Sequence, residues 1–147
     1  MYQELVDFIS DEWIKTIKGS EHFSSYKGDE EKEKNLWNEI SKRYDEGLGS
    51  DNLRVSRTIE ILLNKKIIDS DTIALDIGSG TGAYAISLSK ICKKVYVLDY
   101  FDGMLKILND KTKHISNIET VSFNWEKGNI LDLKLEDEID FSIYRRG

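Results

Sequence analysis

The chain has 147 residues and a formal net charge of -6, from 27 acidic and 21 basic side chains. This length suits one domain with a buried core, and the acidic balance offers no broad surface for a polyanion. No apolar run reaches the ~20 residues that a membrane span requires. We therefore expect a soluble domain that binds neither nucleic acid nor membrane.

The amino terminus, the cysteine content and the histidines bear on the compartment and on metal binding. The opening residues MYQELVDFIS lack the basic segment and apolar core of a secretory signal, and Cys92 is the single cysteine. We expect a cytoplasmic protein without an internal disulfide. His22 and His114 have no cysteine or acid at ligand spacing, so no metal site is expected.

Residues 1–70 have the apolar periodicity of helices, in which side chains three and four positions apart line one face. The apolar positions of three predicted helices are Leu5, Ile9, Trp13 and Ile17, then Trp37, Ile40 and Tyr44, then Val55, Ile59, Leu62 and Leu63. The second helix ends near Gly47, and the third begins at Asp51 or Asn52. We expect these residues to form an N-terminal helical cap.

From residue 71 onward, predicted strands alternate with helices. The expected elements are strands over 72–77, 95–99, 119–124 and 139–144, and helices over 82–92 and 102–113. Alternation with apolar strands such as VYVLD is typical of a parallel sheet with helices on both faces. The predicted fold is α/β: a Rossmann-like, doubly wound, mainly parallel sheet over residues 71–147, behind the helical cap over 1–70.

A glycine-rich stretch, ALDIGSGTGAYAISLSK, connects the first of these strands to a helix. Glycine accepts backbone angles that a side chain forbids, and it lets a ligand reach the free amides at the positive helix end. Gly78, Gly80 and Ala83 match the dinucleotide pattern G-x-G-x-x-G/A, whereas Asp76 and the glycines up to Gly82 match D-x-G-x-G-x-G. The acid favours the second pattern, because a carboxylate repels a pyrophosphate and attracts an ammonium.

A second acid, Asp99, ends the next predicted strand. A carboxylate at this place can accept hydrogen bonds from both hydroxyls of a ribose. Both loop patterns share this acid, so it indicates a nucleoside ligand without deciding between the patterns.

These two stretches resemble the first two motifs of the class I S-adenosylmethionine-dependent methyltransferases. The segment LWNEISKRYDEG resembles the W-x-x-x-a-x-x-Y-D segment that many small-molecule members carry ahead of the sheet, and the resemblance covers roughly residues 35–145. It implies S-adenosyl-L-methionine as the cofactor. The implied cofactor-binding residues are Asp76, Gly78, Ser79, Gly80, Gly82, Asp99, Tyr100, Met104, Asn124 and Trp125.

The resemblance also implies roles for the side chains outside the glycine loop. Tyr100 and Met104 would pack near the adenine, although the helical spacing of Met104 equally suits a core position. Where the family usually has an acid after the third strand, this chain has Asn124 or Asn129, whose carbonyl can accept the same hydrogen bond. Trp125 would offer a stacking face to the adenine. Tyr44 is a weak candidate for contact with the substrate.

The function implied by the resemblance is methyl transfer to a small molecule, by this chain or by a longer protein of which it is the cofactor-binding portion. No catalytic base is identified. Two alternatives stay open: an NAD-binding oxidoreductase, and a noncatalytic module for nucleoside binding or dimerisation. Because the chain ends at Gly147, directly after the fourth predicted strand, we expect a truncated sheet whose open edge forms a homodimer.

Overall fold

A computed structural model describes residues 30–47, 52–122 and 135–144, and every structural statement below concerns these residues. Backbone contacts divide the chain into two units, residues 1–36 and 37–147, and helix α3 (Glu30–Gly47) runs from the first into the second. The first predicted helix, Asn124 and Trp125 lie outside the described residues. None of the described helices is long and apolar enough to cross a membrane. The cytoplasmic location stays a prediction.

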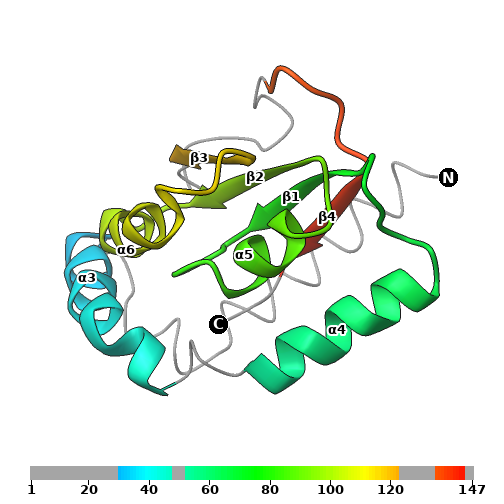
Figure 1. The fold of residues 1–147 in the computed structure, drawn as a ribbon. Helices are drawn as coiled ribbons and strands as arrows, with labels where there is room; N and C mark the ends of the chain where they lie inside the picture. Colours follow the sequence, from blue (N-terminus) through cyan, green and yellow to red (C-terminus); the bar gives the residue numbers. More distant parts are fainter. Residues whose placement is uncertain (1–29, 48–51, 123–134, 145–147) are drawn as a thin grey trace, which may run out of the picture. The chain divides into compact units, whose positions relative to one another are not determined.

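Four parallel strands form the sheet of the second unit, in the order β3-β2-β1-β4 (Figure 1). They are β1 (Ile73–Ile77), β2 (Lys94–Asp99), β3 (Ile118–Ser122) and β4 (Phe141–Tyr144). The chain runs outward from β1 to β3 and then returns to place β4 on the other side of β1. All four predicted strands are present with small shifts of their ends, and the Rossmann-like α/β fold is confirmed.

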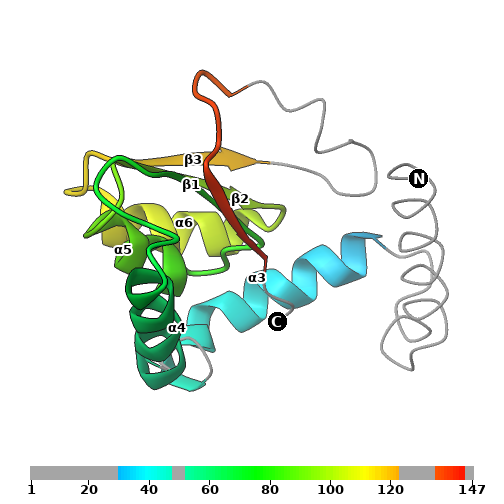
Figure 2. The ribbon, with the colours of Figure 1, turned by 90° about the vertical axis from the view of Figure 1, so that its right-hand side faces the viewer.

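Three helices cover one face of this sheet: α4 (Asn52–Asn64), α5 (Ala83–Ser89) and α6 (Asp102–Thr112). Figure 2 shows α5 and α6 on the same side of the strands. The buried core on this face consists of Val55, Ile59, Ile68, Ala74, Tyr84, Ala85, Leu88, Cys92, Val95, Val97 and Leu108. The helices are therefore held by their apolar side chains, which for α4 include Val55 and Ile59 of the stripe that the sequence predicts.

Two side chains that were predicted to face inward are on the surface instead. Leu63 is 42% exposed, because the buried positions of α4 follow Val55 and Ile59 at helical spacing and Leu63 lies further round the helix. Ile40 is 36% exposed, because the buried side of α3 passes through Ser41, which is 3% exposed. Both helices were correctly predicted, but their buried stripes are narrower than expected.

The second face of the sheet is covered by the segment that leads into β4. Leu75, Tyr96 and Leu98 are buried there, and Leu135 and Ile139 pack against them. The described helices thus lie on one face of the sheet rather than on two. At the outer side of β4, no strand among residues 52–122 and 135–144 is paired with it. The homodimer through this edge stays a prediction.

A cluster of polar side chains lies on this second face of the sheet, at the end where β2 begins. Lys94 Nζ donates to the Tyr96 hydroxyl at 2.6 Å and to Asp137 Oδ2 at 2.9 Å. The Tyr96 hydroxyl in turn donates to Asp137 Oδ2 at 2.7 Å. Because Tyr96 has 0% exposed surface, this cluster supplies both partners that its buried hydroxyl needs.

Replacing Tyr96 with Phe should lower the free energy of unfolding by about 1–2 kcal/mol, since Lys94 and Asp137 would each lose a hydrogen-bond partner. Urea denaturation measures the change. The matched control is Tyr84→Phe, because among the described residues the Tyr84 hydroxyl has one hydrogen-bond partner, Thr58 Oγ1 at 3.3 Å. Equal losses in the two variants would contradict a stabilising role for the cluster.

Candidate cofactor-binding site

The carboxyl ends of β1 and β2 carry the two acids that the sequence singles out. Asp76 is 4% exposed and Asp99 is 5% exposed. Asp76 lies opposite Val97 in the register, and Asp99 follows two residues later, so both carboxylates are on the face that carries α4 to α6. Since β1 adjoins strands on both sides at the point where the strand order reverses, the acids lie where open α/β sheets bind ligands.

Three glycines with positive φ shape the turn from β1 into α5. The φ angles are 68° at Gly78, 56° at Gly80 and 90° at Gly82, a region that side chains rarely adopt. At Gly82 an added Cβ would lie 2.6 Å from Leu108 Cδ1 of α6, so the loop touches that helix directly. The alternate glycines therefore serve the shape of this loop and its close packing.

The amides of the glycine loop already have partners at the end of β2. Gly78 N and Ser79 N donate to the Leu98 carbonyl at 2.8 Å and 3.2 Å, and Gly80 N donates to Asp99 Oδ2 at 2.7 Å. The amides of Gly78, Ser79 and Gly80 are therefore not free, because β2 lies close enough to accept from them. These bonds fix the distance between the loop and Asp99. Contact of a ligand with the amides at the start of α5 stays a prediction.

Asp99 accepts hydrogen bonds from backbone on both sides of the site. Its Oδ1 accepts from Phe101 N at 2.9 Å, while its Oδ2 accepts from Gly80 N. Burial raises the pKa of Asp99, and these backbone amides oppose the shift. Each carboxylate oxygen has a second lone pair, so a ribose hydroxyl can bind without displacing either amide.

The negative charge of Asp76 is less well compensated by hydrogen bonds than that of Asp99. Burial raises the pKa of Asp76 to about 7; the backbone amide of Ala85 lowers it, and the charge of Asp99 raises it. Asp76 Oδ2 and Ser79 Oγ are buried without a hydrogen-bond partner among the described residues. Two such atoms at one loop are what a polar ligand with a cationic end would satisfy.

Comparison with known proteins agrees with this geometry. Residues 75–145 match the family model described as a methyltransferase domain. The chain carries a class I S-adenosylmethionine-dependent methyltransferase domain. The resemblance of the glycine loop and of the Asp99 strand is thereby confirmed, and S-adenosylmethionine is the cofactor of the domain.

Similar proteins include several named methyltransferases. A demethylmenaquinone methyltransferase of Staphylococcus carnosus is 32% identical, over 78% of this chain and 48% of that protein. A probable cobalt-precorrin-6B C(15)-methyltransferase of Methanocaldococcus jannaschii is 26% identical, over 54% of this chain and 39% of that protein. A probable ribosomal RNA small subunit methyltransferase A of Methanococcus maripaludis is 29% identical, over 63% of this chain and 33% of that protein. The chain spans about half the length of these relatives or less.

One solved structure supports the fold. It is phosphoethanolamine N-methyltransferase 1 of Haemonchus contortus, in complex with phosphoethanolamine and S-adenosylhomocysteine. The TM-score is 0.54 at 16% identity, and the match covers 76% of this chain and 24% of that one. At this identity the likeness concerns the arrangement of the strands and helices alone.

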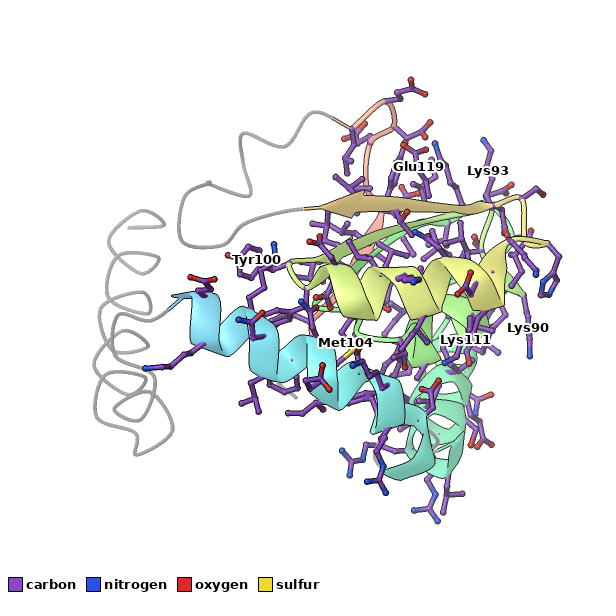
Figure 3. All side chains as sticks on the ribbon, turned by 90° about the vertical axis from the view of Figure 1, so that its left-hand side faces the viewer. Lys90, Lys93, Tyr100, Met104, Lys111 and Glu119 are labelled. Carbon is purple, nitrogen blue, oxygen red and sulfur yellow. The ribbon has the colours of Figure 1, made fainter. Side chains whose placement is uncertain are left out.

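The other predicted site residues of the methyltransferase domain lie around the same edge of the sheet. Met104 is 2% exposed, and Figure 3 shows it between α6 and α3. Tyr100 follows Asp99, and its ring centroid lies 5.2 Å from that of Phe101. A Cβ added at Gly80 would lie 3.7 Å from the Tyr44 ring. The adenine roles of Tyr100 and Met104 and the substrate role of Tyr44 stay predictions.

Three residues that the sequence did not single out meet at the glycine loop. The Thr81 hydroxyl donates to Asp45 Oδ1 at 2.5 Å, and Lys111 Nζ donates to the Thr81 carbonyl at 3.1 Å. Lys111 also forms an ion pair with Asp45. The sequence offered one clue to this contact, since Asp45 is the aspartate of the Y-D segment and directly follows Tyr44. Its partners Thr81 and Lys111 are distant in sequence. Among the residues described, no group of three or more His, Cys, Asp or Glu side chains is placed to hold a metal ion.

The pKa of Asp76 makes cofactor binding depend on pH. S-adenosylhomocysteine should bind about tenfold more weakly at pH 6 than at pH 7.5, because only ionised Asp76 attracts the ammonium of the ligand. Affinity should rise with pH up to about 7 and then level. Calorimetry across this range measures the profile, and Asp76→Asn should flatten it.

The same substitution separates binding from stability. The folded-state pKa of Asp76 lies above the ordinary value of 3.8, so the ligand-free protein loses stability as the pH rises from about 4 to 7. Asp76→Asn should therefore melt at a higher temperature than the wild type at pH 7.5 while binding the ligand more weakly. A variant that keeps the wild-type pH profile of binding would contradict the role of this carboxylate.

Proposed function

We propose that this domain transfers a methyl group from S-adenosylmethionine to a small molecule. The observation that carries the proposal is the buried Oδ2 of Asp76, near the glycine loop and Asp99, which has no hydrogen-bond partner within residues 30–47, 52–122 and 135–144. A ligand with a cationic amino-acid end and a ribose would satisfy both acids at once. NAD offers a ribose but brings a pyrophosphate to the loop, where Asp76 would repel it.

Each end of the cofactor has its own group of residues in this proposal. Asp76 and Ser79 would hold the polar atoms of the methionine end, with Gly78, Gly80 and Gly82 shaping the loop around it. Asp99 would accept hydrogen bonds from the ribose hydroxyls. The adenine would lie against Tyr100 and Met104, and Asn124 and Trp125 are proposed for the same end from the sequence alone.

Methyl transfer from this cofactor requires little of the protein beyond the positioning of the reactants. When bound, S-adenosylmethionine supplies a methyl group that its sulfonium already activates. The residues of this chain then have to orient the cofactor and exclude water, and a base is needed only where the acceptor must lose a proton. We assign no such base.

The acceptor class rests on charge rather than on the relatives. The relatives include a demethylmenaquinone methyltransferase and ribosomal RNA methyltransferases, so they do not exclude a nucleic-acid partner. A net charge of -6 disfavours the phosphate contacts that dominate nucleic-acid affinity. We therefore propose a small-molecule acceptor.

Calorimetry with S-adenosylmethionine, S-adenosylhomocysteine and NAD tests the cofactor part of the proposal. Both adenosyl ligands should bind at least about tenfold more tightly than NAD, because the two acids match them at both ends. Asp99→Ala should weaken both adenosyl ligands by roughly 2 to 4 kcal/mol, since two ribose hydroxyls lose their acceptor. Asp110→Ala, which removes an exposed acid of α6, is the control and should leave affinity unchanged.

The acceptor is tested with methyl-labelled S-adenosylmethionine, incubated separately with a small-molecule extract and with ribosomal RNA. Label should appear in the small-molecule fraction. Transfer of the label to RNA would reverse the proposed acceptor class. In the calorimetry, tighter binding of NAD than of the adenosyl ligands would overturn the proposed function altogether.

A further inference from the structure

Thr81 lies within the glycine loop, yet its polar atoms are held from outside it. The side chain is buried, with 1% of its surface exposed. Its hydroxyl donates to Asp45 Oδ1, near the end of α3, and its carbonyl accepts from Lys111 of α6. Asp45 and Lys111 also pair with each other, so the three residues form a closed ring that we name the Thr81 latch.

The helix that carries Asp45 also contacts the connection between β2 and α6, which directly follows Asp99. Asn38 Oδ1 accepts from Gly103 N at 2.9 Å, at the start of α6. Trp37 stacks on Phe101 with ring centroids 5.5 Å apart. A Cβ at Gly103 would come within 2.7 Å of Asn38 Oδ1, so the backbones approach closely there. From Trp37 to Asp45, α3 therefore contacts both the glycine loop and the connection between β2 and α6.

The exposure of the latch residues indicates what the latch does. The Asp45 and Lys111 side chains are 37% and 34% exposed, so solvent screens their ion pair and it adds little to global stability. Thr81, in contrast, stands between Gly80 and Gly82, two residues with positive φ and no side chain. The latch holds the hydroxyl and the carbonyl of the one residue between these two glycines.

We infer that Asp45 and Lys111 are positioning residues that hold Thr81, and through it the glycine loop, in the shape that receives the methionine end of the cofactor. This inference rests on the proposed function, because it takes the loop to surround that end. Figure 3 shows Lys111 on α6, the helix from which it reaches Thr81. Neither residue touches the cofactor itself in this account.

The two ends of the ligand should respond differently when the latch is removed. The ribose end depends on Asp99, whose Oδ2 accepts from Gly80 N in the loop but whose Oδ1 accepts from the Phe101 amide, outside the loop. The methionine end depends on the loop around Gly80. Loss of the latch should therefore weaken a ligand that has the methionine end and spare a ligand that lacks it. A general loss of structure would weaken both ligands alike.

Calorimetry with S-adenosylhomocysteine and with adenosine makes this comparison in the full chain. Thr81→Val and Asp45→Ala should each weaken S-adenosylhomocysteine by about tenfold, the effect of one lost hydrogen bond to a charged group, and change adenosine by less than about twofold. Thr81→Ser keeps the hydroxyl and should restore wild-type affinity. Thr120→Val removes a hydroxyl of β3 that donates to Asn109 Oδ1, outside the glycine loop, and is the matched control.

The double variant adds a second criterion. Asp45→Ala combined with Thr81→Val should lose no more affinity than either change alone, because both break the same hydrogen bond. Equal weakening of the two ligands, or unchanged S-adenosylhomocysteine affinity in Thr81→Val and Asp45→Ala, would overturn the positioning role alone. Wild-type protein that binds neither ligand would overturn the proposed function, and this inference with it.

Discussion

The site depends on the burial of two carboxylates, Asp76 and Asp99, beneath one glycine loop. A buried carboxylate is costly unless hydrogen bonds or a cation compensate it. Asp99 receives backbone amides from both neighbouring loops, whereas Asp76 keeps one oxygen without a donor among the described residues. The ligand-free fold therefore contains an acid whose charge is poorly stabilised, and a cationic ligand would remove that deficit.

The rest of the domain holds these acids in place. The parallel pairing of β1 with β2 brings the two strand ends together, and α5 and α6 cover them from one face. The glycine loop is then fixed from three sides: by Leu98 and Asp99 of β2, by Leu108 packed on Gly82, and by the Thr81 latch. Rigid support of this kind lets a short loop position a ligand without its own side-chain network.

Much of this arrangement could be predicted from the sequence, because it is encoded locally. The strands, the alternate glycines and both acids lie within two short stretches whose spacing reflects backbone geometry. The latch could not be predicted, because Asp45, Thr81 and Lys111 come from separate elements and meet only through the packing of α3 and α6. The partners of the loop amides were missed for the same reason, since they depend on how closely β2 approaches.

The most direct test of this account is a crystal structure of the protein with S-adenosylhomocysteine. We expect the amino group of the ligand within about 3 Å of Asp76 Oδ2, or joined to it by one water, with the ribose hydroxyls on Asp99. The account would be contradicted by a ligand bound elsewhere, such as the groove between α4 and α5 lined by Ile59, Leu63 and Ile91. It would equally be contradicted by a ligand in the loop whose amino group leaves Asp76 without a partner.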